Sequence, residues 1–504
     1  MKQRDVATTG IEGLDDVLSG GLTKDRIYLV MGDPGVGKTT LGLHFLLEGV
    51  RLGERVLYIG LSETRDEIQA VADSHGWSLD QVEIFEYSAA ARLDEADEST
   101  LFHPSEVELG QATRTMVQEV ERVQPQRVVI DSLAEVRLLA QSPLRYRRQI
   151  LGLKQYFAGK HSTVLLLDDK EVASGDMQLL TLAHGVVLLE QLSPLYGAER
   201  RRMRISKLRG VKYRGGYHDL TIRTGGIAVF PRLVAAEHQT PDKPGRIESG
   251  IAGIDSLLGG GLDRGTSTLL MGPAGSGKST LATQYAVAAA ERGENVTMFL
   301  FDESRTTLLK RSEAINIEVS KHIESGRILI QQIDPAEIPP GEFVHLVREQ
   351  VTKRDISVLV IDSLNGYINA MPEERFLTIH MHELLSYLGQ QGVATILVMA
   401  QHGLVGQNML TPVDVSYLAD CVILLRYFEL AGEIRKAISV VKKRSGAHEK
   451  AIRPLAIGED GLTVGPPLTE FHGVLSGTPI LDTSVASVMT GSGENRVGAN
   501  SWVR

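Results

Sequence analysis

The chain has 504 residues and a formal net charge of −10, with 53 Lys and Arg against 63 Asp and Glu. Proteins that bind nucleic acid over much of their surface are usually basic, and the single cysteine excludes an intramolecular disulfide framework and a cysteine-only zinc site. No apolar stretch follows the first charged residues and no apolar run approaches the ~18 residues of a membrane span, so we expect a cytoplasmic globular protein with neither membrane nor nucleic acid as partner.

The first half of the chain alternates strand-like and helix-like segments. Short apolar and β-branched runs at 26–31, 56–59, 127–130 and 163–167 predict buried strands, and 41–51 places apolar side chains on one helical face. Strands that alternate with helices in this way predict an α/β fold, in which a mostly parallel sheet is flanked by helices on both faces.

A phosphate-binding loop follows the first of these strands. Residues 32–39 read GDPGVGKT and fit the pattern GxxxxGK[ST] between a strand and a helix. The glycines let backbone N–H groups turn toward the phosphates, the lysine reaches the β and γ oxygens, and the hydroxyl helps to hold Mg²⁺. The predicted ATP contacts are Gly32, Gly35, Val36, Gly37, Lys38, Thr39 and Thr40, and Thr39 is also a predicted Mg²⁺ ligand.

Acidic residues follow two strands of the first half. Asp131 ends the strand at 127–130, where a carboxylate would hold the water shell of Mg²⁺ beside the phosphate loop. The alternative for Asp131 is an aspartate that caps the next turn. Glu63 follows the strand at 56–59, where a carboxylate would polarise the attacking water or hydroxyl, and its alternative is a solvated residue at a helix start.

Two basic residues stand late in the first half on a strand-like alternation. Lys207 and Arg209 are two positions apart, so their side chains would point the same way on a strand. Cations this far from the phosphate loop are typical of residues that reach the γ-phosphate of a neighbouring subunit, and we expect Lys207, Leu208 and Arg209 to contact ATP. A solvated basic strand edge is the alternative.

The second half repeats these features. Thr9-Gly10-Ile11 returns as Ser249-Gly250-Ile251 and Lys38 returns as Lys278, both 240 positions later. A period this long indicates a duplicated domain rather than a solenoid. Pro, Gly and polar residues between the copies predict a linker. The predicted division is a first domain at 1–238, a linker at 239–246, a second domain at 247–484 and a flexible tail at 485–504.

The second copy carries its own set of candidate residues. A second phosphate loop, GPAGSGKS, occupies 272–279, and a second acid ends the strand at 358–361. Two adjacent acids, rather than one, follow the strand at 296–301. The predicted residues are the ATP contacts Gly272, Gly275, Ser276, Gly277, Lys278, Ser279, Thr280, Lys442 and Arg444, the Mg²⁺ ligands Ser279 and Asp362, and the catalytic acids Asp302 and Glu303.

Together these motifs resemble the KaiC family, the circadian-clock ATPases of cyanobacteria within the RecA-like superfamily. The resemblance rests on the two loops, the repeated IDSL, the DES at 302–304 and the paired KLRG and KKRS, and it covers roughly residues 7 to 480. It implies two tandem RecA-like P-loop domains that stack as two rings of a homohexamer, with ATP and Mg²⁺ between subunits. It also implies that the first ring hydrolyses ATP, while the second is a serine/threonine autokinase that phosphorylates and dephosphorylates Ser416.

Three departures from the family pattern change these expectations. Ser62 replaces the first of two glutamates, which leaves Glu63 as the only candidate base in the first ring. Tyr417 replaces a threonine beside Ser416, which argues against an ordered two-site phosphorylation cycle. The segment after Pro479 lacks the charged helical character that captures the activator KaiA. The chain therefore resembles KaiC relatives outside the cyanobacterial clock, with a KaiB-like protein or a histidine kinase as the expected partner.

Two other functions fit the same fold. A DNA-dependent motor would need a basic track, for which 200–202, Lys212 and Arg214 offer little against an acidic whole. A nucleotide-gated scaffold would use ATP only to join subunits. We expect instead an ATPase and self-kinase that acts as a slow, clock-like timing or signalling switch.

Overall fold

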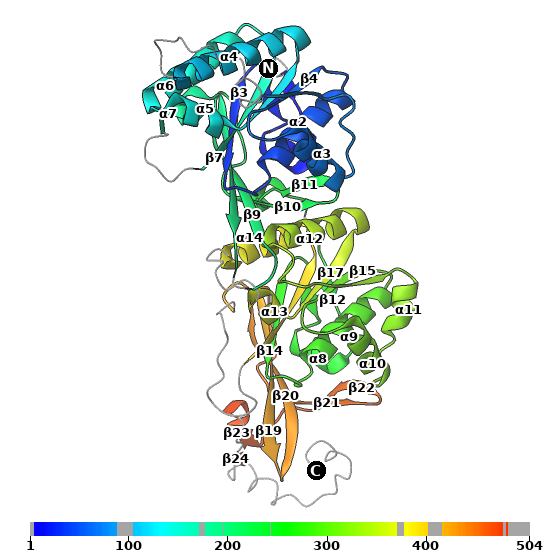
Figure 1. Cartoon of the computed structure of the whole chain (residues 1–504). Coiled ribbons are helices and arrows are strands. Elements are labelled where there is room, and N and C mark those ends of the chain that lie inside the picture. The colour runs from blue at the N-terminus through cyan, green and yellow to red at the C-terminus, as the bar shows by residue number, and fades with distance from the viewer. Residues whose placement is uncertain are drawn as a thin grey trace, which may run out of the picture. The chain divides into compact units, whose positions relative to one another are not determined.

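The computed structural model describes residues 5–87, 104–170, 177–194, 196–241, 243–369, 377–401, 416–476 and 480–481. The chain divides into two compact units, Met1–Arg232 and Leu233–Arg504 (Figure 1). The division precedes the predicted linker because Leu233 and Ala235 are buried in the core of the second unit, where the Ala235 N–H donates to Glu383 Oε2 at 3.0 Å. The predicted tail at 485–504 lies outside the described residues.

The first unit is built on a sheet whose described strands follow the order β11-β10-β9-β8-β3-β7-β6-β4-β5. The strands from β8 to β5 pair in parallel, whereas β9, β10 and β11 extend the sheet as antiparallel neighbours. The four predicted strands are β3, β4, β6 and β7. The bounds are β3 Ile27–Gly32, β4 Val56–Gly60, β5 Glu83–Glu86, β6 Arg127–Asp131, β7 Thr163–Asp169, β8 Gly185–Leu192, β9 Arg200–Leu208, β10 His218–Arg223 and β11 Gly226–Phe230.

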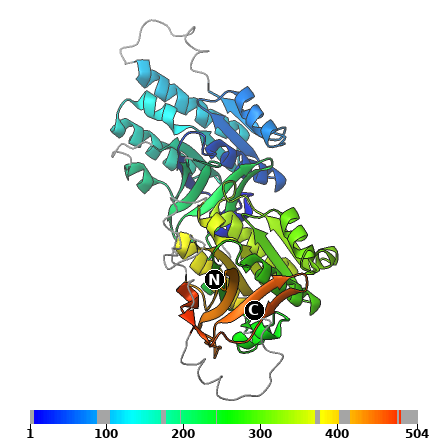
Figure 2. The same cartoon turned by 90° about the horizontal axis from the view of Figure 1, so that it is seen from below.

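Helices cover both faces of this sheet. Figures 1 and 2 show α2 and α3, in blue, on one side and α4 to α6, in cyan, on the other. Alternate residues of β3 serve the two faces: Tyr28 and Val30 lie in one core, and Ile27, Leu29 and Met31 lie in the other. The bounds are α1 Glu12–Val17, α2 Lys38–Arg51, α3 Arg65–Ser74, α4 Pro104–Val123, α5 Leu133–Ala140, α6 Pro143–Phe157 and α7 Met177–Leu182.

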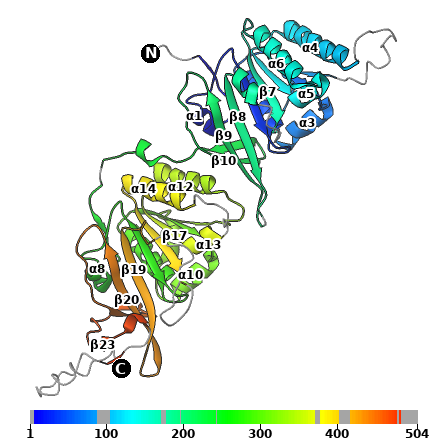
Figure 3. The same ribbon diagram turned by 90° about the vertical axis from the view of Figure 1, so that its left-hand side faces the viewer.

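The second unit repeats the topology with β14 in the place of β3. The order of its described strands is β16-β15-β17-β18-β14-β19-β20-β21-β22. Strands β19 and β20 form a long antiparallel hairpin, drawn in orange in Figures 1 and 3. The bounds are β14 Ser267–Gly272, β15 Asn295–Leu300, β16 Ile328–Gln332, β17 Ile356–Asp362, β18 Ala394–Ala400, β19 Cys421–Leu430, β20 Glu433–Lys443, β21 Arg453–Gly458 and β22 Gly461–Val464.

Two helical layers again enclose the sheet. One core contains residues of α8 to α11 and the other contains residues of α12 to α14. The bounds are α8 Ala252–Leu257, α9 Lys278–Glu291, α10 Arg305–Glu313, α11 Val319–Glu324, α12 Pro340–Arg354, α13 Leu364–Asn369 and α14 Leu377–Gln390. The α/β prediction is thus confirmed in both halves. Over the part of the chain that the structure describes, no helix has the length and apolar character needed to cross a membrane.

Candidate active site

Both phosphate loops lie at the carboxyl end of the central strand of their sheet. In the first unit β3 ends at Gly32 and α2 begins at Lys38, so the loop turns directly into a helix. Gly35 and Gly37 have φ values of 76° and 106°, and Gly275 and Gly277 have values of 74° and 105°. Positive φ is costly for residues with a side chain, so these glycines let both loops take the same inward-turned shape.

The two loop lysines are buried but differ in their partners. Lys38 Nζ donates to the carbonyls of Gly32 and Asp33 at 2.9 and 3.0 Å and lies 2.8 Å from Asp169 Oδ1. Lys278 Nζ donates to Pro273 O at 2.7 Å, and burial lowers its pKa to about 8. A lysine held against carbonyls at the start of a helix is well placed to bind phosphate oxygens.

The remaining predicted loop contacts turn their side chains inward. Val36 and Ser276 are fully buried, and Thr40 and Thr280 lie buried in the first helical turns. These four residues therefore offer backbone N–H groups, rather than side chains, to a phosphate.

A hydroxyl and a carboxylate meet at each predicted magnesium position. Thr39 Oγ1 donates to Asp131 Oδ2 at 2.7 Å. In the second unit the nearby Ser279 hydroxyl opposes the rise that burial causes in the pKa of Asp362. Asp362 Oδ2 is buried without a hydrogen-bond partner among the described residues. Mg²⁺ at nucleotide sites takes few protein ligands, because phosphates and waters complete its octahedron. The donor set therefore fits Mg²⁺ bound together with a nucleotide, and within the described ranges no cluster of three or more His, Cys, Asp or Glu could hold a metal ion by itself.

The acid of the first unit lies within this group. Glu63 Oε1 is 3.4 Å from Thr39 Oγ1, and Glu63 Oε2 is 3.4 Å from the Tyr58 hydroxyl. Burial and the nearby Asp131 carboxylate raise the pKa of Glu63. Tyr58, on β4, also donates to Asp131 Oδ2 at 2.7 Å. Sequence reasoning missed Tyr58, whose only signal was a buried aromatic residue with a hydroxyl that needs a partner.

The two acids of the second unit point to different partners. The Ser363 hydroxyl donates to Asp302 Oδ2, whereas Glu303 Oε2 lies 3.0 Å from Arg311 Nη1. Burial raises the pKa of Glu303, and the Arg311 guanidinium opposes that rise. Met298 occupies the position on β15 that Tyr58 has on β4. Arg311, on α10, is a second residue that the sequence analysis did not identify.

The predicted basic pair of the first unit binds the backbone at the end of α7, just before β8 begins. Lys207 Nζ donates to Leu180 O at 2.6 Å and to Ala183 O at 2.8 Å. The Arg209 guanidinium donates to Thr181 O at 2.6 Å. The two side chains therefore point to the same segment, as their spacing predicted, while Leu208 between them is buried in the core and pairs with Gly185 in the sheet.

The basic pair of the second unit does the same at the start of β19. Lys442 Nζ donates to the carbonyls of Ser416 and Ala419 at 2.9 and 2.7 Å, and Arg444 Nη2 donates to Tyr417 O at 2.7 Å. The predicted phosphoacceptor Ser416 and both predicted cations are therefore brought together, although they are far apart in the sequence.

Both basic pairs lie away from the phosphate loop of their own unit. Lys207 is level with Leu29 of β3, and Lys442 is level with Leu269 of β14, whereas the loops follow Gly32 and Gly272. At about 3.3 Å per strand residue this is ~10 Å along the sheet, before the length of the loop is added. The lysine side chains, moreover, point toward the opposite edge, where β8 and β19 begin.

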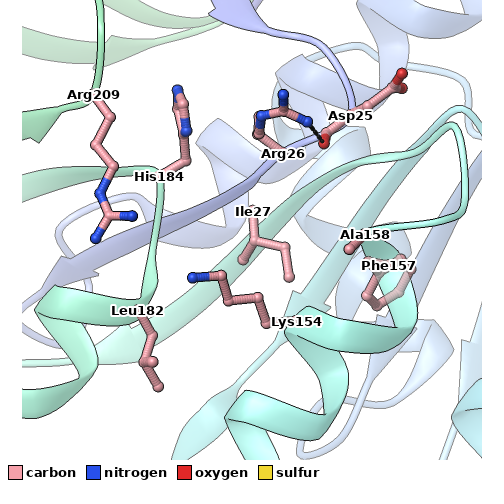
Figure 4. A pocket seen from close by; sticks show the side chains of 9 residues that line it. All are labelled: Asp25, Arg26, Ile27, Lys154, Phe157, Ala158, Leu182, His184 and Arg209. Atoms are coloured by element: carbon pink, nitrogen blue, oxygen red, sulfur yellow. Dashed lines mark hydrogen bonds between the residues drawn. The ribbon is translucent and has the colours of Figure 1, made fainter.

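Arg209 also lines a cavity of about 270 Å³ at this edge of the first unit (Figure 4). Arg26, Lys154 and His184 line the same cavity, and Figure 4 shows the Lys154 ammonium turned toward the side on which Arg209 and His184 lie. Asp25 is the one acid among its lining residues. The charge of this cavity suits an anion.

A family model for the KaiC ATPase matches residues 7–234 and again residues 247–469. The two matched segments account for most of both units.

Individual relatives match over nearly the whole chain. The circadian clock oscillator protein KaiC of Parasynechococcus marenigrum is 27% identical over 481 residues, which cover 94% of this chain and 92% of that protein. The protein of the same name from Thermosynechococcus vestitus is also 27% identical, with 94% and 91% covered. The circadian clock protein KaiC3 of Synechocystis sp. is 26% identical over 483 residues, 94% of each chain.

Proposed function

Because this chain belongs to the KaiC family of ATPases and contains two tandem RecA-like domains, we propose that it is a ring-forming ATPase and autokinase that acts as a slow signalling switch. Six copies form a double ring with Mg²⁺ and ATP between neighbours. The first units hydrolyse ATP, and the second units transfer the γ-phosphate to Ser416 of the adjacent chain. A KaiB-like protein or a histidine kinase reads the state of the ring in the cytoplasm.

One observation carries this proposal. In each unit the basic pair lies ~10 Å or more along the sheet from the loop of the same unit and points away from it. Cations in this position can bind the γ-phosphate of ATP that is held by a neighbouring chain. The cationic cavity beside Arg209 supports this assignment. A nucleotide shared by two chains links ATP binding to assembly, because ligand that binds only the joined state stabilises it.

The first unit carries out hydrolysis. Lys38 and the backbone N–H groups of its loop hold the β- and γ-phosphates. Thr39 and Asp131 would hold Mg²⁺, which would supply positive charge beside the transferring group. Glu63, kept weakly acidic by burial, takes the proton of the attacking water. The neighbour's Lys207 and Arg209 stabilise the charge that develops on the phosphoryl oxygens.

The second unit carries out phosphotransfer. Lys442 and Arg444 fix the backbone of Ser416 and Tyr417, so the cations and the acceptor reach the neighbour's γ-phosphate as one group. The Ser416 oxygen forms the new bond to phosphorus, the bond to the bridging oxygen of ADP breaks, and the hydroxyl proton passes to Asp302.

A phosphosite map tests the proposal directly. The purified chain is incubated with Mg·ATP, with and without DNA, and phosphate on the protein and free phosphate are both measured. We expect phosphate on Ser416 and a hydrolysis rate that DNA leaves unchanged. Hydrolysis that requires DNA would indicate a motor, and an unmodified chain that still assembles would indicate a nucleotide-gated scaffold.

A further inference from the structure

The side chain that contacts the acidic residues of the site differs between the two units. In the first unit an uncharged donor, the Tyr58 hydroxyl, contacts Asp131 and Glu63. In the second unit the matching position is Met298, which cannot donate, and the Arg311 guanidinium contacts Glu303 instead. Arg311 lies eight positions after Glu303, and the residue eight positions after Glu63 is Val71, which packs against the core.

Arg311 places a positive charge among the acids of the second unit. The first unit brings together the carboxylates of Glu63 and Asp131, with Asp169 paired to Lys38 nearby. In the second unit the Arg311 guanidinium lies beside Glu303, and its field also acts on Asp362. The guanidinium therefore reduces the repulsion that the acids of the second unit would exert on a triphosphate.

The ion pair restrains Glu303 in particular. The Glu303 side chain is only 19% exposed and that of Arg311 is 29% exposed, so solvent weakens their attraction less than it would at the surface. The guanidinium competes with water for the Glu303 carboxylate, and it opposes the rise that burial causes in the pKa of Glu303. Asp302 accepts from the Ser363 hydroxyl and forms no ion pair among the described residues, so no guanidinium blocks its carboxylate from the Ser416 hydroxyl.

We propose that Arg311 is a specificity-determining residue of the second unit, because its guanidinium withholds Glu303 from water and so directs the γ-phosphate to the Ser416 hydroxyl. This rests on the proposed function. In both reactions the same bond to ADP breaks. In phosphotransfer the new bond joins Ser416 Oγ to phosphorus and Asp302 receives the proton, whereas in hydrolysis the oxygen of water attacks and Glu303 receives the proton.

The test uses the full chain in a Glu63→Gln background, which silences hydrolysis by the first unit. Free phosphate released and phosphate incorporated into the protein are measured together at a series of ATP concentrations. Arg311→Val introduces the residue of the first unit, and we expect the ratio of release to incorporation to rise about tenfold through kcat, with the KM for ATP unchanged. Arg311→Lys should keep the ratio within about twofold of the parent, because it keeps the charge.

Lys310→Val is the matched control, since Lys310 is the exposed cation next to Arg311 on the same helix. Arg311→Gln is the second variant and should behave like Arg311→Val. An unchanged ratio in Arg311→Val and Arg311→Gln, or an equal fall of both products, would overturn the inference. If the parent incorporates no phosphate, the autokinase proposal fails, but the inference still requires faster phosphate release from Arg311→Val than from Lys310→Val.

Discussion

The Tyr58 hydroxyl donates a hydrogen bond to Asp131 Oδ2 at 2.7 Å and lies 3.4 Å from Glu63 Oε2. The Tyr58 hydroxyl thus contacts both the predicted metal ligand of the first unit, Asp131, and the predicted base, Glu63. Tyr58 is fully buried, and both burial and the two carboxylates raise the pKa of its hydroxyl, so it remains a donor throughout the physiological range. The second unit has Met298 at the matching position. Methionine cannot donate a hydrogen bond, so this contact occurs only in the first unit.

Tyr58→Phe should therefore slow hydrolysis by the first unit. Loss of a hydrogen bond to a charged group costs about 1.5 to 3 kcal/mol, so we expect a rate lower by about tenfold or more, with ATP binding preserved. Tyr28→Phe is the matched control, because Tyr28 is a fully buried tyrosine of the same sheet whose hydroxyl donates to Thr23 O. Steady-state phosphate release measures both, and equal rates for the two variants would contradict the role of Tyr58.

The two loop lysines should have separable roles. Each holds the β- and γ-phosphates of its own unit, so its removal should slow that unit's chemistry on the order of 100-fold. Lys38→Ala should remove most steady hydrolysis together with ring assembly, whereas Lys278→Ala should abolish self-phosphorylation and spare hydrolysis. Phosphate release, sedimentation and labelling from γ-labelled ATP distinguish the two variants. The same profile for both would refute a division of labour.

Ser416 should carry most of the incorporated phosphate. Ser416→Ala removes the hydroxyl but keeps the carbonyl that accepts from Lys442, so the local structure should persist. We expect labelling to fall to near background while hydrolysis by the first unit continues. Tyr417→Phe is the control, since it removes the neighbouring hydroxyl and should leave labelling unchanged. A phosphosite on Tyr417 or Thr411, the latter outside the described residues, would show that Ser416 is misassigned.

The stability of the first unit should fall in weak acid because of His218. This side chain is buried, its Nδ1 accepts from the Arg232 N–H at 2.9 Å, and burial lowers its pKa to about 4. The unfolded chain binds the proton near pH 6.5, so stability is intact above that value and decreases as the pH falls toward 4. Between pH 7.5 and 5.5 the loss from His218 should be about 1 kcal/mol.

Urea unfolding at these two pH values measures that loss. His218→Gln, which can still accept from the Arg232 N–H but does not titrate, should reduce the pH dependence by the same amount. An identical pH dependence in the parent chain and the variant would exclude His218 as its source.

Features set by local sequence were predictable. The phosphate loops need glycine at positions of positive φ and a lysine at the start of a helix, so GDPGVGKT and GPAGSGKS indicate both loop and context. Strands β3, β4, β6 and β7 are buried on both faces and therefore appear as continuous apolar runs. The repeat then extended each assignment to the second unit.

Features set by tertiary contacts were not predictable in the same way. Tyr58 reads as a core residue of a strand and Arg311 as a solvated residue of a helix, and only the folded chain brings them to the acids. The antiparallel strands β9 to β11 and β20 to β22 also lack the continuous apolar pattern. The domain boundary at Leu233 also depends on tertiary contacts. A single apolar residue before a polar stretch could pack in the core of either unit, and Leu233 packs in that of the second.

The most direct test of the shared site combines two inactive chains. Lys278→Ala lacks a working loop but keeps Ser416, Lys442 and Arg444, whereas Arg444→Ala keeps the loop and lacks one cation. The chains are distinguished by mass, mixed in equal amounts, allowed to exchange subunits and incubated with γ-labelled ATP.

If the nucleotide of one chain serves its neighbour, random pairing should restore about a quarter of the parent's sites, since head-to-tail contacts pair loop and cations independently. The label should appear on the Lys278→Ala chain, whose own loop cannot hold ATP. No gain of label on mixing, or label confined to the Arg444→Ala chain, would contradict a site shared between subunits.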